Sequence, residues 1–490
     1  MRCTVLATLL AAAGFGILPV AAGADPPWSP AASVGPVADY VEQPSIAFWP
    51  DGVGALGWLT RRQPAGAGGL PGAISVTYKG GNDGFAGHVG VVAPSAAPAL
   101  VRSVPDSLAA PPALYGHDRA LVLRSVVLSS AANANRRVRL SASIATAAGA
   151  LSRAHELTRA TLVRAPALAA DPRGDAVAAW VELTPKRAPR EFDARYRVRV
   201  AQRSAGGRFG RAVTLLDATG TPTDHGGQIA AGYGADGTIV VVYANRRTLD
   251  AFVRRPGHGW STRRTLGANA GFVEADVAVG AHGRAVVAWG TQDGGEEANR
   301  PWVVRAAFLP AGHSVFRPAQ VIDPGGAVDR PAGTVAAALG ADGRGLVTWS
   351  GVALDPAPGS QGPFSYPVRV AASDGSGRFG AYQGVAPSGA AGDAAIAPDG
   401  GALVTWAGLA QHTFDSQDGV GIFAALRAAG ADTFTAPEAV APGEPALDPR
   451  AAFDPVSGVA SVVWAGRPGG HTPANGVASD ALLRLARRGA

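Results

Sequence analysis

A turn glycine followed six residues later by an aromatic residue recurs along this 490-residue chain and constrains its fold more than any other feature. The stretch PDGGALVTWAG (398–408) is one copy, in which Gly400 precedes Trp406. Six other copies keep this offset, and they pair Gly52 with Trp58, Gly174 with Trp180, Gly237 with Tyr243, Gly283 with Trp289, Gly343 with Trp349 and Gly458 with Trp464. An offset kept in seven places indicates a structural repeat.

An eighth copy of the repeat is degenerate. In GHDRALVLRSVV (116–127), Asp118 occupies the turn position and Arg124 stands where the aromatic residue belongs. Successive turn positions lie between 46 and 66 residues apart, with a mean near 58. Repeats of this length are typical of solenoids, propellers and other arrays.

Each repeat has room for four short strands. The first is small and apolar, as in GDAAIAP (392–398), and an Asp-Gly turn that tolerates positive φ leads into the apolar second strand. A third strand alternates, as in YRVRVAQR (196–203), and the fourth carries an aromatic and an apolar residue six apart, such as Phe209 and Leu215. Four antiparallel strands repeated radially predict a β-propeller.

The two ends of the chain extend this prediction. The last repeat ends after its third strand, ASDALLRLAR (478–487), whereas Trp28 and Val34 near the N-terminus reproduce the fourth-strand spacing. We therefore expect the N-terminal strand to complete the last blade and to cover two strand edges. The predicted fold is an all-β, eight-bladed β-propeller of four-stranded antiparallel blades, in which residues 25–490 form a single domain.

The recurring Asp-Gly turn and tryptophan resemble the repeats of sialidase-like and WD-type propellers, and the resemblance extends over essentially all of the mature chain. It implies a propeller fold. The sialidase Asp box, S-x-D-x-G-x-T-W, places its tryptophan five residues after the aspartate, whereas seven residues separate Asp399 from Trp406 here. The combined Gly-His and Trp-Asp signature of WD repeats is also missing, since no tryptophan is followed by aspartate, so no functional residue carries over from either family.

Residues 1–24 have the pattern of a secretory signal peptide. Arg2 precedes an apolar run, and Ala22-Gly23-Ala24 forms an A-x-A cleavage site before Asp25. We expect a secreted protein that is cleaved after Ala24, and no later segment resembles a membrane span. The only cysteine, Cys3, lies inside the signal, so the mature chain is expected to form no disulfide and no thiolate metal site.

The charge of the chain argues against a nucleic-acid partner. Its formal net charge is +6, and nearly all the positive residues are arginines scattered in singles and doublets, with no long basic run. We expect a monomer that needs no cofactor or metal. The acidic stretches TQDGGEE (291–297) and FDSQDG (414–419) lack the spacing of a calcium loop.

Long, dissimilar loops are predicted on one face, between the second and third strands of the blades. They cover residues 60–72, 181–194, 290–301, 351–365, 407–420 and 466–476. The opposite face has mostly tight Asp-Gly turns. Variable loops on a rigid scaffold are common binding sites, although they can also be insertions without a ligand.

Few polar residues fall on the predicted inner strands, and they are Gln43, Ser45, Gln228, Glu274, Asp276, Asp393 and Arg450. Asp276 and Asp393 stand at the same repeat position, seven residues before the turn glycine, so they could face each other across the channel mouth. Such a pair could transfer protons or hold a cation, or the two could be hydrated residues at strand ends. The loops that share this face contain His225, His412 and His471.

Known enzyme signatures are not found in the sequence. There is no G-x-S-x-G elbow and no H-E-x-x-H helix, and GSGRFG (375–380) lies between a third and a fourth strand, where a hairpin turn is expected. A sialidase-like site would also need an arginine cluster, and the inner strands carry only Arg450.

Three functions remain open at this stage. The first is a secreted module that binds a glycan, a peptide or a cell-surface partner through the long-loop face. The second is a glycan-active hydrolase or lyase with its site at the channel mouth, and the third is a structural envelope protein. The candidate binding residues are Gln228, Glu274, Asp276, Asp393, Arg450, His225 and His412.

Overall fold

The computed structural model describes a large part of the chain. The described residues are 28–38, 40–48, 52, 54–61, 85–92, 99–104, 107–108, 110, 113–115, 119–128, 137–146, 150–185, 194–220, 227–245, 247–268, 274–292, 302–325, 335–351, 367–409, 419–444, 446–466 and 481–488. The predicted signal peptide, the three loop histidines and most of the six long loops lie outside them.

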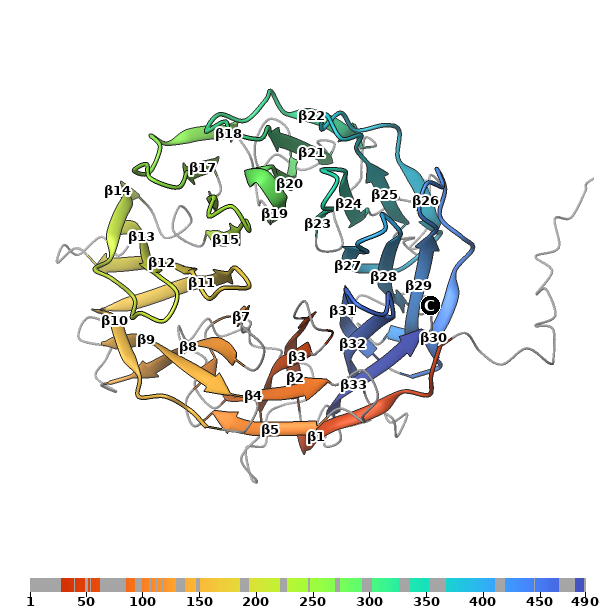
Figure 1. Cartoon of the computed structure of the whole chain (residues 1–490), viewed down its shortest axis with the longest axis horizontal. Coiled ribbons are helices and arrows are strands. Elements are labelled where there is room, and N and C mark those ends of the chain that lie inside the picture. Colours follow the sequence, from red (N-terminus) through yellow and green to blue (C-terminus); the bar gives the residue numbers. More distant parts are fainter. Residues whose placement is uncertain are drawn as a thin grey trace, which may run out of the picture.

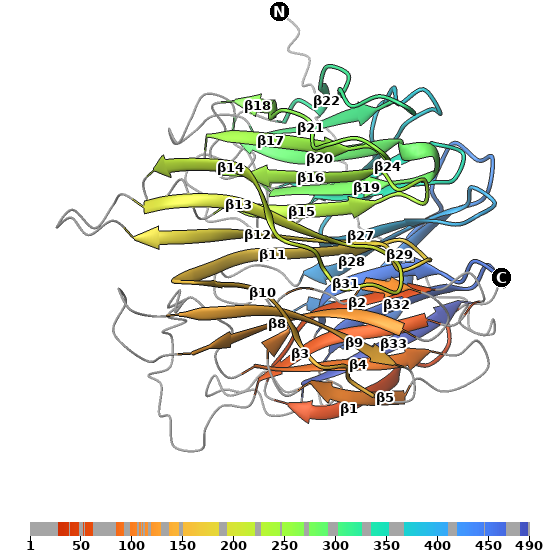
Figure 2. The same cartoon turned by 60° about the vertical axis from the view of Figure 1, so that its left-hand side comes forward.

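Within these residues the chain forms eight antiparallel sheets, and the one helical element is the 3-10 turn η1 (Ala281–Gly283). The sheets are arranged around a common centre in a propeller-like fold, with the strands of each sheet ordered from the centre to the periphery (Figure 1). Seen from the side, the axes of the strands are roughly aligned and cross the thickness of the molecule (Figure 2).

The first four sheets follow the chain, and their strands are given from the centre outward. Sheet one contains β2 (Tyr40–Phe48), β3 (Gly54–Arg61), β4 (Phe85–Val92) and β5 (Ala99–Val104). Sheet two contains β6 (Ser107–Leu108), β7 (Ala113–Tyr115), β8 (Arg119–Val127), β9 (Val138–Thr146) and β10 (His155–Ala160). Sheet three contains β11 (Leu162–Ala170), β12 (Ala176–Pro185), β13 (Ala194–Arg203) and β14 (Val213–Gly220). Sheet four contains β15 (Gln228–Tyr233), β16 (Ile239–Ala244), β17 (Thr248–Arg254) and β18 (Arg264–Ala268).

The last four sheets keep the same order. Sheet five contains β19 (Glu274–Val279), β20 (Ala285–Gln292), β21 (Trp302–Leu309) and β22 (Gln320–Asp323). Sheet six contains β23 (Ala336–Leu339), β24 (Gly345–Ser350), β25 (Val368–Ala372) and β26 (Gln383–Ala386). Sheet seven contains β27 (Ala390–Ile396), β28 (Ala402–Leu409), β29 (Gly419–Arg427) and β30 (Glu438–Pro442). Sheet eight contains β31 (Ala446–Phe453), β32 (Ala460–Gly466), β33 (Ala481–Arg488) and β1 (Ala32–Ala38).

The predicted turn glycines have the backbone conformation that a tight hairpin requires. All seven have positive φ, between 66° and 98°. At Gly174 the neighbourhood also excludes a side chain, because an added Cβ would lie 2.4 Å from the ring of Tyr115. All seven positions therefore favour glycine for the backbone conformation, and Gly174 needs it for packing as well.

The aromatic residues six positions later are core residues. Trp58, Trp180, Trp289, Trp349, Trp406, Trp464 and Tyr243 all have an exposed fraction of 2% or less. The apolar clusters around them join neighbouring sheets, as where Val242 of sheet four packs with Val287 of sheet five. The repeat motif is therefore part of the scaffold, and each tryptophan fills space between sheets.

The N-terminal strand pairs with the last sheet, as the sequence predicted. Val34 of β1 lies opposite Leu483 of β33, and Trp28 forms a bridge with Arg488. The same bridge joins Phe209 to Arg203 in sheet three, so Trp28 occupies the fourth-strand aromatic position.

The degenerate repeat also forms a sheet. Two short strands, β6 and β7, both pair with β8 in place of a single continuous inner strand. Arg124 takes the aromatic position in β8 and lies opposite Ser141 of β9. A polar residue is tolerated there because Arg124 Nη1 donates a hydrogen bond to Ser143 Oγ, 3.5 Å away.

Candidate functional site

Three charged side chains predicted for the inner strands come from three different sheets. Asp276 lies in β19, Asp393 in β27 and Arg450 in β31, and these strands surround the centre in Figure 1. Burial raises the pKa of both aspartates, Arg450 opposes this rise in each, and Asp276 adds to it in Asp393. The structure therefore places the three groups in one electrostatic environment.

Each aspartate connects two neighbouring sheets through backbone N–H groups. Asp276 Oδ1 accepts from Val277, 2.8 Å away in its own strand, and Oδ2 accepts from Ala337 of β23 at 2.9 Å. Asp393 repeats this arrangement with Ala394 at 2.9 Å and Ala451 of β31 at 3.1 Å. Both aspartates thus help to hold adjacent inner strands together.

Arg450 and Gln228 make inter-sheet contacts of the same kind. Arg450 Nη1 donates to the carbonyl of Gly392 in β27 at 3.0 Å. Gln228 Oε1 accepts from the backbone N–H of Ala275 in β19 at 3.0 Å, although the residue is exposed overall. Inner-strand polar residues therefore connect sheets four to five, five to six and seven to eight.

Of the remaining sequence-predicted residues, Ser45 is described and lies outside this cluster. Ser45 donates its Oγ hydrogen to the carbonyl of Gly57 within its own sheet, at 3.2 Å. Gln43 and Glu274 begin inner strands, but their side chains lie outside the described part of the chain, as do His225 and His412.

Burial raises the pKa of both aspartates above the ordinary range. For Asp276 burial is the largest effect, and it is opposed by the N–H groups of Ala337 and Val277 and by Arg450. For Asp393 burial raises the pKa to about 6, with Arg450 acting in the opposite direction. A carboxyl group with a pKa near 6 changes protonation close to neutral pH, which is a property of acid–base groups.

The structure also shows a buried carboxylate that the sequence did not reveal. Asp323, at the end of β22 in sheet five, accepts through Oδ2 from two residues of sheet six, Trp349 Nε1 at 2.8 Å and Arg369 Nη1 at 2.6 Å. Arg369 lies directly opposite Trp349 on the neighbouring strand. The indole, the carboxylate and the guanidinium therefore form one satisfied buried group.

The same three-part group occurs in two other sheets. Glu182 accepts from Trp180 Nε1 at 3.1 Å and from Arg199 Nη1 at 3.3 Å. Glu444 accepts from Trp464 Nε1 at 3.3 Å and Arg484 Nε at 3.1 Å. The arginines follow an apolar-Arg-apolar pattern in the third strands, and this pattern was the available sequence signal.

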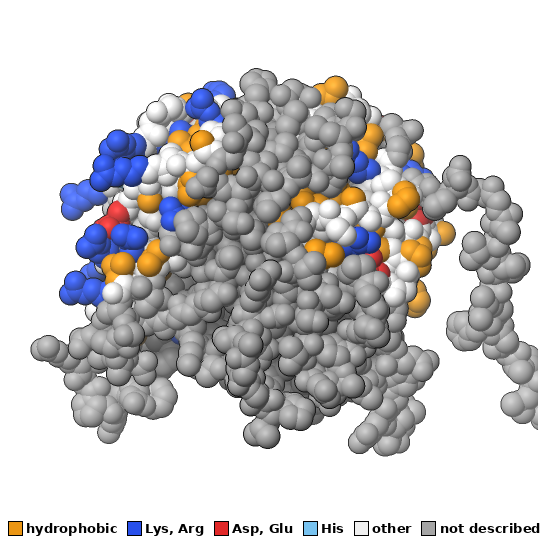
Figure 3. Space-filling model, turned by 90° about the horizontal axis from the view of Figure 1, so that it is seen from below, with side chains coloured by type: hydrophobic (Ala, Val, Ile, Leu, Met, Phe, Trp, Pro, Cys, Tyr) orange, Lys and Arg blue, Asp and Glu red, His pale blue; other side chains and the backbone are white. Residues whose placement is uncertain are grey.

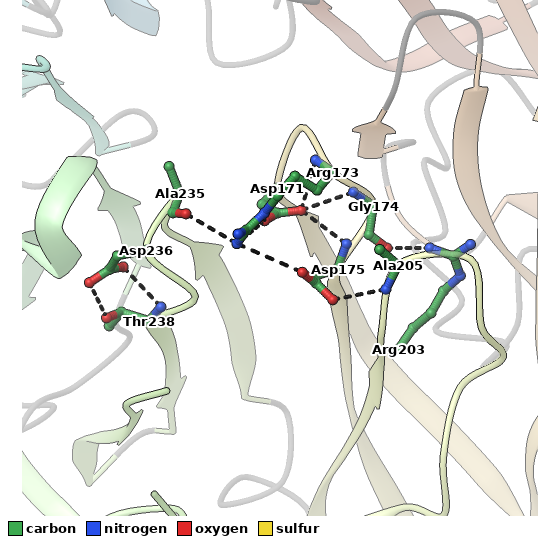
Figure 4. Close-up of polar contacts among 9 residues, drawn as sticks. All are labelled: Asp171, Arg173, Gly174, Asp175, Arg203, Ala205, Ala235, Asp236 and Thr238. Carbon is green, nitrogen blue, oxygen red and sulfur yellow. Dashed lines mark hydrogen bonds and ion pairs between the residues drawn. The ribbon is translucent and has the colours of Figure 1, made fainter. Parts of the chain in front are cut away.

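A second polar cluster lies at the short turns between sheets three and four (Figure 4). Asp171 Oδ1 accepts from the backbone N–H groups of Arg173, Gly174 and Asp175 at 2.9–3.0 Å. The Arg173 side chain binds Asp171 Oδ2 and reaches the carbonyl of Ala235 in the next sheet at 3.2 Å. The cluster fixes a turn and connects two sheets, so it is a structural element.

The described part of the chain contains no group of three or more His, Cys, Asp or Glu side chains arranged to hold a metal ion. It also contains no helix with the length and hydropathy needed to cross a membrane.

Comparison with known proteins gives matches only among solved structures. No family model matches the sequence, and neither does any curated protein. Polysaccharide lyase Uly1 is similar over 78% of this chain and 90% of its own, with 10% identity and a TM-score of 0.45. A Hadza microbial sialidase is similar over 73% of this chain and 74% of its own, with 11% identity and a TM-score of 0.33.

A third similar structure is an α-L-arabinanase of Penicillium chrysogenum. It matches over 65% of this chain and 92% of its own, with 13% identity and a TM-score of 0.34. At these identities the comparison concerns the general fold, and no residue or reaction carries over to this chain.

Proposed function

We propose that this chain is a secreted, glycan-directed β-propeller in which Asp276, Asp393 and Arg450 contact the glycan at the central channel. In this proposal the eight sheets are eight blades of one closed ring, formed by residues 25–490. The first 24 residues act as a cleaved signal peptide.

Strand neighbours support the closed ring. Each inner strand lies beside the inner strand of the next sheet, as β15 lies beside β19 and β27 beside β31. The inner strand of the last sheet, β31, in turn lies beside β2 of the first. Pairing of β1 with β33 leaves the last sheet with the same four strands as its neighbours.

The observation that carries the functional proposal is the placement of Asp276, Asp393 and Arg450 on the inner wall formed by the strands nearest the centre, which is rich in small apolar residues. Ala275, Ala336, Ala394 and Ala451 are typical of that wall and are buried. Carboxylates and a guanidinium can together bind sugar hydroxyls and an acidic sugar group. A cluster with perturbed pKa values in a cleft is also a recognised mark of a functional site.

Glycan cleavage is favoured by one property of the cluster. The pKa of Asp393, raised to about 6, would let this carboxyl group donate a proton to a leaving glycosidic oxygen near neutral pH. The positive charge of Arg450 could pair with a uronate carboxylate in the substrate. The similar structures named above are a polysaccharide lyase, a sialidase and an arabinanase, in line with this candidate.

Glycan binding without cleavage is favoured by a different observation. Both oxygens of Asp276 and both of Asp393 already accept backbone N–H groups. These bonds fix the carboxylates in place and occupy one lone pair of each oxygen, which suits a rigid binding wall as well as catalysis.

A polysaccharide panel tests the proposal and separates the two candidates. The purified mature chain is mixed with neutral and uronate-containing polysaccharides, and binding is followed by affinity electrophoresis while new reducing ends are assayed. We expect at least one polysaccharide to retain the wild-type chain. The affinity for that polysaccharide should fall tenfold or more in an Asp393→Asn, Arg450→Gln variant of unchanged fold. New chain ends identify cleavage, and retention alone identifies binding. The absence of both retention and new chain ends with every polysaccharide of the panel would contradict both candidates.

A further inference from the structure

Positive charge is concentrated in one part of the ring. Residues 150–268 contain 19 of the chain's 43 lysines and arginines but 10 of its 37 acidic residues, a net charge of +9. Residues 302–488 contain 12 basic and 15 acidic residues, a net charge of −3. The overall charge of +6 therefore conceals a strongly asymmetric molecule.

This basic segment builds β10, sheet three and sheet four. Figure 3 shows arginine side chains gathered on the left of the molecule, where β13 and β14 lie in Figure 1, with few acidic side chains among them. The asymmetry in the sequence is thus a basic region on the outer surface of the fold.

Four exposed arginines lie at the outermost strands of this region, and we call them the arginine rim. Arg153 precedes β10, Arg208 and Arg211 lie between β13 and β14, and Arg264 begins β18. Among the described residues none of the four side chains is paired with a carboxylate. They are therefore available to an external anion.

Contacts between sheets place the rim arginines along one edge. His155 Nε2 lies 2.9 Å from the carbonyl oxygen of Phe209, which brings the start of β10 next to the segment with Arg208 and Arg211. Farther along, Trp260, which is four residues before Arg264, packs against the same apolar cluster as Leu215 of β14. The rim therefore continues across three neighbouring sheets.

The acidic side chains nearby are already neutralised. Asp217 forms ion pairs with Arg195 at 2.5 Å and Arg197 at 3.1 Å, and Arg195 in particular lowers the pKa of Asp217 to about 2. Glu156 pairs with Arg159 at 2.8 Å. These pairs remove the local negative charge that would otherwise compensate the rim.

Guanidinium groups in a row suit a ligand with repeated anionic groups. Each guanidinium can form two parallel hydrogen bonds to a carboxylate or a sulfate. A rim that spans three sheets presents these donors along an edge, which matches a chain of anions better than a single small ion. Nucleic acid fits less well, because no aromatic side chain in the described part of residues 150–268 is exposed for base stacking.

We propose that the arginine rim binds a polyanionic polysaccharide along the outer edge of sheets two to four. This rests on the proposed glycan-directed function and specifies an acidic glycan as the ligand class. The rim is separate from Asp276, Asp393 and Arg450, which we call the channel cluster. The rim would hold the polymer while the channel cluster contacts one segment of it.

Dextran sulfate and neutral dextran test this proposal, because they share a backbone and differ in charge. We expect the mature chain to bind dextran sulfate but not dextran. An Arg208→Gln, Arg211→Gln variant should bind at least tenfold more weakly, and the slope of log K against log salt should fall by about two.

The matched control is Arg344→Gln, Arg378→Gln, which removes two exposed arginines from sheet six and the same net charge. We expect its affinity for dextran sulfate to stay within twofold of the wild type. Equal losses in both variants would show a response to net charge alone and would overturn the rim. Binding of single-stranded DNA as strong as that of dextran sulfate, through the same arginines, would overturn the assignment to a glycan.

The channel variant separates this inference from the proposed function. Asp393→Asn, Arg450→Gln should retain dextran sulfate binding, because the rim is intact. If the Arg208→Gln, Arg211→Gln variant binds dextran sulfate as the wild type does, while panel polysaccharides still bind at the channel, only the present inference is wrong. If the rim binds and the channel variant behaves as wild type throughout the panel, the proposed function is wrong.

Discussion

At the scale of single residues, the buried tryptophans differ in whether the indole N–H has a partner. Trp349 donates to Asp323, whereas Trp289 Nε1 is buried without a hydrogen-bond partner. Replacing either tryptophan with phenylalanine removes the indole N–H and reduces the side-chain volume by the same amount. We expect Trp349→Phe to lower the free energy of unfolding by about 1–2 kcal/mol more than Trp289→Phe does. Urea denaturation measures both, and equal losses would contradict the role given to Asp323.

Asp393 gives a prediction about pH at the same scale. Its pKa is about 6 in the folded protein against a reference value of 3.8, so the folded state holds the proton more tightly. The stabilisation is fully present below pH 3.8 and is lost as the pH rises through 6.

The comparison is with Asp393→Asn, which does not titrate. Between pH 7.5 and 4.5 we expect the wild type to gain about 2 kcal/mol of unfolding free energy relative to this variant. Denaturant titrations at the two pH values measure the difference. A constant gap between wild type and variant would mean that the pKa of Asp393 is not raised.

At the scale of strands and hairpins, the sequence contains most of the architecture. A glycine with positive φ and an aromatic residue at a fixed offset are local requirements, so Gly174, Gly400 and their counterparts were readable from spacing alone. The pairing of β1 with β33 was readable because Trp28 and Val34 keep the fourth-strand spacing.

The polar contacts between sheets were not readable in the same way. The carboxylate beside each tryptophan comes from a different place: Glu182 from the second strand, Asp323 from the outer strand of the preceding sheet and Glu444 from the segment before β31. No constant spacing can describe such a set. Asp276 and Asp393 suggested a facing pair, and their bonds to the next inner strand follow from how sheets pack.

The N-terminal strand gives the prediction that belongs to this scale. Deleting residues 25–36 removes Trp28 and Val34, which are 3% and 1% exposed, and uncovers the edge of β33. We expect the free energy of unfolding to fall by at least about 4 kcal/mol. Thermal and urea melts of this deletion should be compared with a deletion of residues 25–27, which keeps Trp28. An unchanged stability in the longer deletion would refute the closing role of β1.

At the scale of the whole molecule, the two groups of residues proposed to contact a glycan lie in separate places. Asp276, Asp393 and Arg450 lie on inner strands, whereas the arginine rim follows the outer edge of sheets two to four. The inner groups stood out in the sequence because they interrupt small apolar strands. The rim did not, because its arginines are far apart in the chain and become neighbours only when the sheets stand side by side.

Contact between a glycan and Asp276, Asp393 and Arg450 can be seen directly in a crystal structure with a bound oligosaccharide. The ligand would be a fragment of whichever polysaccharide is retained in the panel. We expect sugar density within hydrogen-bonding distance of Arg450 and of Asp276 or Asp393. Density confined to the long loops or to the outer edge, with an empty channel, would contradict it.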